Sequence, residues 1–598
     1  MNPYPSRMSS RLRRPGALHL AVALAALLLT AFVHGQEPSA ALKQADADYR
    51  QGVAALNRGD LKAAKSLFEA VVRLAPAAEQ GHSALGAVLV RQGQTDDGIK
   101  ELQKALAMKP SDGSAQENLA MAYAQTGAPG KALPLFSKLE TAAGAEKRAL
   151  TPDVLEAYAR ALAATGNSAA ALVRLNLAVA QEPRNAAWRN ELGTLYAMGG
   201  DWERAEPEFR EAVRLDPQLA LAHLHLGSVL QAEHKPGAAQ EWGEAVGLAP
   251  KNPQIALIAG RGLAEAGADD LALPVLERAH ELAPGSTEAA YELALVLQRA
   301  SRMEASIPLL KTVVAAEPKN GDALINLGLA LTQTQHAKDA VPLLQRAVAL
   351  KPEDGTAHQN LAAAYVQLNQ LDDAVVELKA ALKISPDAPQ LHYNLGLAYK
   401  MQDDAAAAIP ELETAQELNP QAWEPAYVLG LEYMQVARYD EAAPQLETAL
   451  KLHPDNGEGW ATLGSVYNKM NKLPEAVAAL REAIRQLPDN SDPHLTLAAV
   501  LVKQSQPEEA AAERKKAAEL MRAHMNLQRA EVATGSGKSL LLAGKLDDAI
   551  VEFRAALGFD PNYAAAHLGL AEALEKEGKT AEAQAELELA KTAAKSPQ

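Results

Sequence analysis

The stretch GEGWATLGSVYNKMNKLPEAVAALREAIRQLPDN, residues 457–490, carries the pattern that decides the fold. Four of its residues follow the i, i+3, i+4, i+7 spacing of one helix face: Trp460, Leu463, Gly464 and Tyr467. A second set, Ala476, Leu480 and Ala483, follows the i, i+4, i+7 spacing of another helix. The stretch therefore predicts two helices joined by a turn.

The boundaries of these two helices are also marked in the sequence. Asn471 stands at the turn between them, and Pro488 ends the second helix because proline cannot continue it. Asn490 offers a side-chain oxygen that can cap the helix that follows.

The same pattern recurs along the chain. Eight prolines follow one another at steps of 34 residues: Pro250, Pro284, Pro318, Pro352, Pro386, Pro420, Pro454 and Pro488. About sixteen such repeats fill residues 45–598, with two long repeats at 113–151 and 491–529. Places within a repeat are numbered here from 1, so that Gly457 holds place 1 and Pro488 place 32.

Small residues recur at two places of every repeat. Place 8 is glycine or alanine, as at Gly464 and Ala362, and place 20 is alanine in most repeats, as at Ala476. Two small residues let the paired helices approach closely, and a larger side chain would overpack them. One helix pair cannot bury its apolar face alone, so we expect stacking of repeats to supply the core.

This pattern resembles the tetratricopeptide repeat (TPR), whose W-x2-L-G-x2-Y and A-x3-F positions are matched by Trp460 to Tyr467 and by Ala64 and Phe68. The resemblance covers residues 45–598. It implies an all-α fold, an α-solenoid in which about sixteen helix-turn-helix TPR units form a right-handed superhelix. It also implies that the first helix of each repeat lines a concave groove that holds an extended peptide or a partner helix.

Composition agrees with this interpretation and excludes several functions. Of 598 residues, 48% are hydrophobic but only 4% are aromatic, which favours close-packed helices over sheets. The net charge of −16 argues against a nucleic-acid partner. Cysteine is absent, which excludes disulfides, thiolate metal sites and a lipidated cysteine.

The N-terminal residues have the pattern of a targeting segment. Residues 1–35 hold four arginines and no acid, and an apolar run covers residues 17–33. This order predicts a signal peptide cut before Gln36, followed by a linker over 36–44. We therefore expect a periplasmic or secreted protein of bacterial type. The alternative is an uncleaved anchor, and in either case the membrane is contacted only through this segment.

One motif suggests nucleotide chemistry. GSGKS, at 535–539, resembles part of a phosphate-binding loop, but Val532 stands where the first glycine of that loop is required. Gly537 falls at place 8 of its repeat, so the repeat explains the motif and no nucleotide is expected.

Histidines recur at place 4, and acidic pairs open many second helices. We interpret the histidines, among them His82, His358 and His567, as substitutes for the packing aromatic seen at Trp460, with no carboxylate cluster to meet them. We interpret acidic pairs such as Asp372 and Asp373 as complements to helix N-termini. The sequence therefore predicts no metal, no cofactor, no catalytic residue and no enzyme.

The candidate binding residues come from the TPR resemblance. Place 6, which faces the groove by analogy, is asparagine in three successive repeats, at Asn326, Asn360 and Asn394. Each amide offers both donors and an acceptor, so it could pair with the N–H and the C=O of a peptide bond. This series resembles the row of peptide-binding asparagines in O-linked N-acetylglucosamine transferases. The alternative is that they are ordinary solvent-facing residues. Six further residues complete the candidate groove: Gln333, Gln359, Gln367, Tyr393, Tyr427 and Gln435.

Three functions stay open. The leading hypothesis is a non-catalytic scaffold outside the cytoplasm that binds extended or helical segments of partner proteins in the groove. The alternatives are a periplasmic component of an exopolysaccharide-export or pilus-assembly machine, and an enzyme. The long repeats 113–151 and 491–529 are either tolerated insertions or joints, and residues 508–531 could form one long helix.

Overall fold

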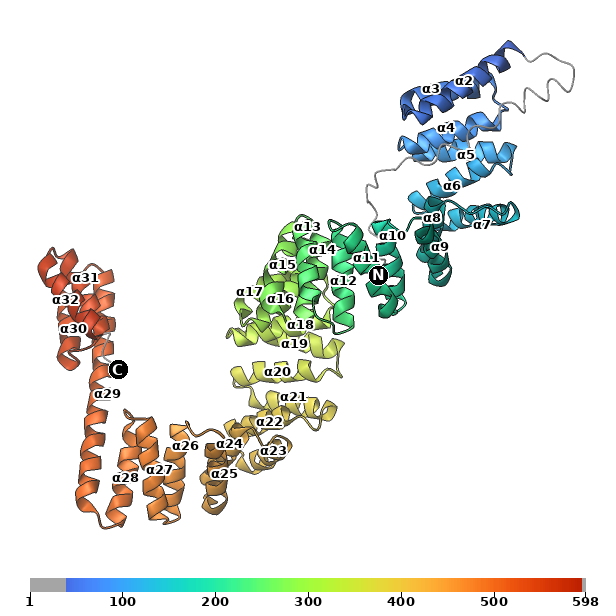
Figure 1. Ribbon diagram of the computed structural model, residues 1–598. Helices are drawn as coiled ribbons and strands as arrows, with labels where there is room; N and C mark the ends of the chain where they lie inside the picture. Colours follow the sequence, from blue (N-terminus) through green and yellow to red (C-terminus); the bar gives the residue numbers. More distant parts are fainter. Residues whose placement is uncertain (1–38, 594–598) are drawn as a thin grey trace. The chain divides into compact units, whose positions relative to one another are not determined.

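The computed structural model describes residues 39–593 as a succession of helices, α2 to α32, with no strand among the described residues (Figure 1). Helices pair along the chain, and each pair packs against the next. Most first helices have 13 residues and most second helices have 14, as in α26 and α27. Among the described residues, no helix is both long and apolar enough to cross a membrane.

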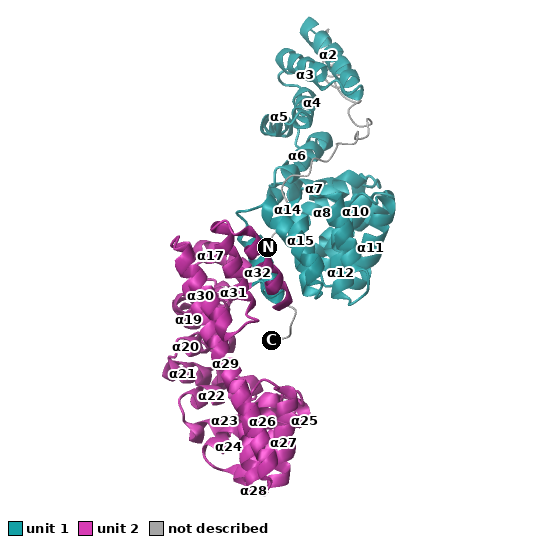
Figure 2. Ribbon diagram, turned by 90° about the vertical axis from the view of Figure 1, so that its left-hand side faces the viewer, with its two compact units in different colours: residues 1–302 teal, residues 303–598 magenta. Residues whose placement is uncertain are grey.

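The chain divides into two compact units, residues 1–302 and 303–598 (Figure 2). The helices of unit 1 are α2 (Ala40–Asn57), α3 (Leu61–Leu74), α4 (Glu79–Arg91), α5 (Thr95–Met108), α6 (Gly113–Gln125), α7 (Pro129–Ala145), α8 (Pro152–Ala164), α9 (Ser168–Gln181), α10 (Ala186–Met198), α11 (Trp202–Leu215), α12 (Ala220–Ala232), α13 (Ala238–Leu248), α14 (Pro253–Glu265), α15 (Asp269–Leu282) and α16 (Thr287–Arg299).

Unit 2 continues the same alternation of first and second helices. Its helices are α17 (Met303–Ala316), α18 (Gly321–Gln333), α19 (Ala337–Leu350), α20 (Gly355–Gln367), α21 (Leu371–Ile384), α22 (Pro389–Met401), α23 (Ala405–Leu418), α24 (Trp423–Gln435), α25 (Tyr439–Leu452), α26 (Gly457–Lys469), α27 (Leu473–Gln486), α28 (Ser491–Lys503), α29 (Pro507–Leu542), α30 (Leu546–Phe559), α31 (Ala564–Lys576) and α32 (Thr580–Ala593).

Local chemistry sets the helix ends. Asn490 accepts a hydrogen bond from the backbone N–H of Asp492, which confirms the predicted cap of α28. Asn471 has φ 59°, and this left-handed residue ends α26 and starts the turn to α27. Asparagine adopts this conformation more readily than most residues, which is why it suits the turn.

The small residue at place 8 brings the paired helices together. A Cβ added to Gly464 of α26 would lie 2.6 Å from Leu480 Cγ of α27, so only glycine fits without movement. Leu480 is fully buried as a result. The predicted close approach of the two helices is therefore confirmed here.

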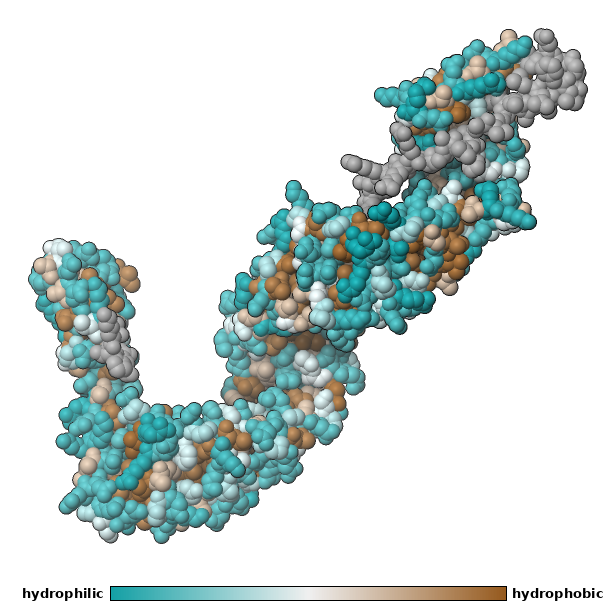
Figure 3. Space-filling view, viewed as in Figure 1, coloured by the Kyte–Doolittle hydropathy of each residue, from teal (hydrophilic) through white to brown (hydrophobic). Residues whose placement is uncertain are grey.

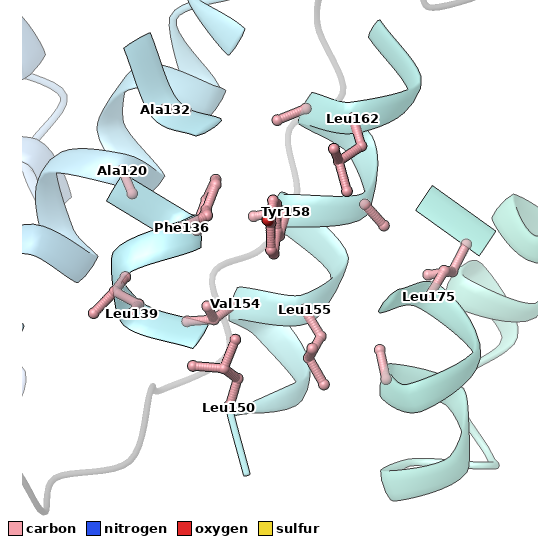
Figure 4. Packing of buried hydrophobic residues seen from close by; sticks show 14 of the residues in the cluster. Ala120, Ala132, Phe136, Leu139, Leu150, Val154, Leu155, Tyr158, Leu162 and Leu175 are labelled. Atoms are coloured by element: carbon pink, nitrogen blue, oxygen red, sulfur yellow. The ribbon is translucent and has the colours of Figure 1, made fainter. Parts of the chain in front are cut away.

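Stacking between neighbouring repeats closes the core, and it continues across the long repeat 113–151. Phe136 of α7 stacks on Tyr158 of α8, with ring centroids 5.2 Å apart (Figure 4). Leu139 and Val154 are buried in the same cluster. The extra residues lengthen α7 to 17 residues and form the segment before α8, so this insertion leaves the stack intact.

The second long repeat behaves differently. Helix α29 runs for 36 residues from Pro507 to Leu542, so the predicted long helix over 508–531 is confirmed and extends further. It includes the second helix of repeat 491–529 and the first helix of the next repeat, without a turn. The GSGKS motif lies inside this helix, where a Cβ on Gly537 would come within 2.8 Å of Phe553.

The predicted linker over 36–44 requires a correction. Helix α2 begins at Ala40, inside that segment, because Ser39 caps it by accepting from the Leu42 N–H and alanines follow. The predicted signal peptide, residues 1–35, and its cleavage point before Gln36 lie outside the described residues.

Candidate functional site

The candidate site lies on the first helices α18, α20, α22 and α24 of unit 2. Residues at places 5, 9 and 12 share one face of each first helix, since they are spaced i, i+4 and i+7. Figure 3 shows one face of each unit, where apolar patches alternate with hydrophilic side chains. We refer to the surface made by places 5, 6, 9, 12 and 13 of these four helices as the first-helix face.

The three asparagines of place 6 have different environments. Asn326 is half-buried, and its Nδ2 donates to the carbonyl of Asp322, 2.9 Å away on the same helix. Asn394 is half-buried, and its Oδ1 accepts from Gln390 Nε2 at 3.0 Å. Asn360 is only 9% exposed, and its Nδ2 has no hydrogen-bond partner among the described residues. Only Asn360 therefore retains a buried donor without a protein acceptor.

The glutamines of the predicted groove are on the same helices. Gln359 is half-buried, whereas Gln333, Gln367 and Gln435 are exposed. Gln367 of α20 donates to the Thr332 carbonyl of α18 at 3.1 Å and to Gln335 Oε1 at 2.8 Å. This glutamine therefore joins neighbouring repeats.

The two predicted tyrosines are half-buried at place 5 of adjacent first helices. Burial, followed by the charge of Glu424, raises the pKa of Tyr393. Burial, followed by the charge of Glu458, raises the pKa of Tyr427. Both phenols therefore stay neutral and can donate a hydrogen bond at physiological pH.

The sequence analysis missed a buried ion pair on these helices. Lys400 Nζ of α22 lies 3.0 Å from Glu432 Oε1 of α24, and the side chain of Glu432 is 1% exposed. Glu432 Oε2 has no hydrogen-bond partner in the described part of the chain. Glu432 holds place 10, where the neighbouring repeats have Ala398 and Val466. That break in an apolar place was the available signal.

Each of five place-4 histidines contacts a single glutamate, a contact that was not predicted from the sequence. In five repeats Nδ1 lies 2.5–2.7 Å from a glutamate oxygen and Nε2 lies 2.9–3.2 Å from the carbonyl of the preceding repeat's proline. These histidine–glutamate pairs are His82–Glu101, His223–Glu241, His358–Glu377, His392–Glu411 and His567–Glu586.

This geometry has a chemical consequence. A carbonyl oxygen only accepts hydrogen bonds, so Nε2 donates to the proline carbonyl while Nδ1 faces the glutamate. Trp460 makes the corresponding bond from Nε1 to the Pro454 carbonyl at 2.9 Å. In these six repeats, place 4 therefore links the repeat to the end of the one before it, in addition to packing.

Unit 1 holds a separate polar cluster on its first helices. Glu156 of α8 is buried and hydrogen-bonds Glu191 of α10, while Arg160 lies 3.0 Å from Glu156. Burial first, and the charge of Glu156 second, raise the pKa of Glu191 to about 8. Burial lowers the pKa of His225 on α12 to about 4, so its neutral ring donates from Nδ1 to Asn190 Oδ1 at 2.9 Å.

No group of three or more histidine, aspartate or glutamate residues in residues 39–593 is arranged to hold a metal ion. A shallow pocket of unit 2 is lined by α25, α26 and α27, including Glu447, Trp460 and Tyr467. None of the predicted groove residues lines it.

Comparison with protein families identifies the repeat. Family models described as tetratricopeptide repeat match residues 46–78, 83–147, 156–220, 291–355, 389–421, 427–491, 462–523 and 540–598, and one described as TPR repeat matches residues 364–403. This chain belongs to the TPR family. The predicted all-α solenoid of TPR units is therefore confirmed, and TPR proteins are generally non-catalytic interaction scaffolds.

Individual relatives of this TPR protein cover parts of it. Cellulose synthase operon protein C of Xanthomonas axonopodis pv. citri (strain 306) is 31% identical over 159 residues, which are 26% of this chain and 10% of that protein. The chain thus matches about a tenth of the length of this curated relative.

Two solved structures are similar to parts of the chain. The solved chain of MamA from Desulfovibrio magneticus RS-1, which holds residues 41 to the end, is 21% identical, with a TM-score of 0.28, and the match covers 28% of this chain and 95% of that chain. YrrB, described as a TPR protein with an unusual peptide-binding site, is 22% identical, with a TM-score of 0.28, and the match covers 32% of this chain and 98% of YrrB.

Proposed function

We propose that this TPR protein is a non-catalytic scaffold that acts outside the cytoplasm and binds extended or helical segments of partner proteins on the first-helix face of unit 2. The proposed location of the binding site rests on one observation. Asn360 holds a buried amide nitrogen that has no acceptor in the described part of the chain. A buried donor without a partner costs free energy, and a bound peptide carbonyl would supply the acceptor after a small side-chain rotation.

The residues around Asn360 suit a peptide backbone. Gln359 and Asn394 add donors and acceptors, and Tyr393 and Tyr427 add aromatic surface with neutral hydroxyls. Amide groups pair with peptide bonds without selecting the partner's side chains, whereas tyrosines contribute apolar contact area. The combination favours an extended segment with some apolar residues.

Affinity capture tests this proposal. Residues 36–598 serve as bait in the native envelope, with Asn326, Asn360 and Asn394 changed together to alanine. We expect loss of most captured partner, with circular dichroism unchanged. The matched control changes Lys338, Asp373 and Glu417 to alanine, since these are exposed on the second helices α19, α21 and α23. Equal capture by both variants would contradict the proposed site.

A second candidate function is a periplasmic part of an exopolysaccharide-export or pilus-assembly machine. It is favoured by the 31% identity to cellulose synthase operon protein C. Co-purification with an outer-membrane barrel protein, or retention of the chain on a polysaccharide column, would support this function. Capture of partners with neither property would favour the general scaffold.

Export itself is a proposal that rests on the arginines and apolar run of residues 1–35. Intact mass measurement of the protein from its native host tests it. We expect a mature N-terminus at Gln36, and a chain that retains Met1 would contradict cleavage.

A further inference from the structure

Helix α29 interrupts the stacking of repeats in unit 2. Its first part packs along α28, and its last part packs against α30 and α31 (Figure 1). Its buried residues include none between Ala517 and Ala530, so twelve consecutive residues form a bridge without a fully buried side chain. Because the helix runs straight through, the repeat that begins at Ala530 does not stack on the repeat that ends in this bridge.

The interruption uncovers one end of the preceding stack. Places 5, 9 and 12 of a first helix are normally covered in part by the next repeat, as Asn190 and Thr194 of α10 contact His225 of α12. On α28 these places are Leu495, Ala499 and Val502. Leu495 is 42% exposed and Val502 is 48% exposed.

The comparison across repeats shows that this exposure is unusual. Place 5 is buried or half-buried in every other repeat from 79 to 563, and the only other exposed example in the described array is Leu568 of the final repeat, 564–598. Place 12 is likewise buried or half-buried in the other repeats, and its two exposed residues are Val502 and Glu575, in the same two repeats. The end of α28 therefore has the exposure of a terminal repeat although the chain continues.

The next stack begins with the complementary uncovered face. Places 3 and 10 of a first helix normally face the preceding repeat, and both are buried in all repeats between 79 and 529. In the last part of α29 these places are Val532, which is 73% exposed, and Ser539, which is also exposed. Leu542, at place 13, is 90% exposed.

The two faces match as halves of one repeat interface. In the regular array, place 28 meets place 3 of the next repeat, as Leu450 meets Gly459, where an added Cβ would lie 3.0 Å from Leu450 Cδ2. The equivalent pair here is Ala518 and Val532, and both are exposed. Gly535, at place 6, would have nothing within 4 Å of an added Cβ, so this face has room for a close-packed partner.

From these faces we infer that the chain forms a domain-swapped dimer through α29. Each copy has two uncovered faces, one made by Leu495, Ala499 and Val502 and the other by Val532, Ser539 and Leu542. In the dimer, the first face of each copy packs against the second face of the other copy. Such an exchange closes with twofold symmetry and extends the interface that already joins the repeats.

The composition of α29 favours a second copy over closure within one chain. Closure would require a break near residues 518–529, AELMRAHMNLQR, which contain neither glycine nor proline. A helix without these residues resists breaking, since each residue contributes a backbone hydrogen bond and good helix formers predominate. A second copy covers both faces while α29 stays intact.

Disulfide trapping tests the dimer, because the natural chain has no cysteine. Val502 and Ser539 occupy places 12 and 10, the places that Lys400 and Glu432 hold when they bond. We expect Val502→Cys and Ser539→Cys chains, co-expressed and oxidised, to form a species of twice the chain mass. Each single variant alone should remain uncrosslinked.

Light scattering on the mature chain provides the second measurement. We expect a dimer that Val502→Glu converts to a monomer, with Val376→Glu on α21 as the control because Val376 is also exposed. A disulfide within one chain in the Val502→Cys/Ser539→Cys double variant would overturn the second copy as occupant. A wild-type monomer with no disulfide in the co-expressed pair would overturn the dimer altogether.

Discussion

Lys400 Nζ lies 3.0 Å from Glu432 Oε1, so the first helices of two neighbouring repeats are joined by an ion pair whose carboxylate is almost fully buried. The adjacent repeats place Ala398 and Val466 at the position of Glu432. A buried ion pair contributes little net stability, but removing one partner leaves a charge that is costly to bury.

This relationship predicts an asymmetric response to substitution. Lys400→Met should lower the free energy of unfolding of the surrounding repeats by about 3 kcal/mol, because Glu432 is then unpaired. The double variant Lys400→Met/Glu432→Val should recover most of the loss. Hydrogen exchange of α22 and α24 measures both. Equal destabilisation by the single and double variants would show that the ion pair itself holds the helices together.

The histidine links between repeats predict a local loss of protection. Glu377→Gln removes the carboxylate that His358 contacts at 2.5 Å, and a hydrogen bond to a charged group is worth about 1.5–3 kcal/mol. Amide exchange in α20 and α21 should therefore become faster. Glu417→Gln is the control, since Glu417 is exposed on α23. Unchanged exchange in the Glu377 variant would refute a stabilising link.

The carboxyl pair of unit 1 predicts a pH dependence of stability. Burial and Glu156 raise the pKa of Glu191 to about 8, from an ordinary 4.5, so folded Glu191 keeps a proton that the unfolded chain has lost. The free energy of unfolding of unit 1 therefore falls as the pH rises between these values. We expect Glu191→Gln to reduce the fall in melting temperature between about pH 6.5 and about pH 8.5.

The shifted pKa of His225 changes stability with pH in the opposite direction, so the test of Glu191 is confined to neutral and basic pH. Burial lowers the pKa of His225 to about 4 from 6.5, so the unfolded chain binds a proton that folded His225 does not. Stability from this group is lost as the pH falls through that range. Above about pH 6.5 His225 no longer contributes, and equal melting curves for wild type and Glu191→Gln there would contradict the shifted pKa of Glu191.

Close helix pairing predicts opposite effects at two glycines. Gly464→Ala should destabilise by about 1–3 kcal/mol, because the new Cβ would lie 2.6 Å from Leu480 Cγ. Gly558→Ala, on α30 with nothing within 4 Å, should stabilise by about 0.5–1 kcal/mol through helix propensity. Thermal unfolding followed by circular dichroism measures both, and a neutral Gly464→Ala would show that the helices can move apart freely.

The sequence predicted the repeat well because each place has a periodic physical role. Asn471 at the turn, Asn490 at the cap and Gly464 at the helix contact all take their expected positions. Whether the two stacks would separate at the long repeat could not be predicted, since the five extra residues of 491–529 are compatible with either a turn or a continuous helix. The structure forms the helix because no residue breaks it.

The polar contacts were less predictable for a different reason. His358 and Glu377 lie on different helices, 19 residues apart in the sequence, so their contact follows from packing that the repeat pattern alone does not specify. The amide residues of place 6 looked equivalent in sequence. They differ in the structure because Asn326 donates within its own helix whereas Asn360 does not.

The central claim is that partner segments bind on the first-helix face of unit 2, and site-specific photo-crosslinking tests it most directly. A photoreactive residue replaces Gln359 or Gln435 on that face, or Val376 on the second helix α21, in the chain expressed in its native host. The account predicts partner crosslinks from Gln359 and Gln435 and none from Val376. Crosslinks from Val376 alone, or from all three positions equally, would contradict it.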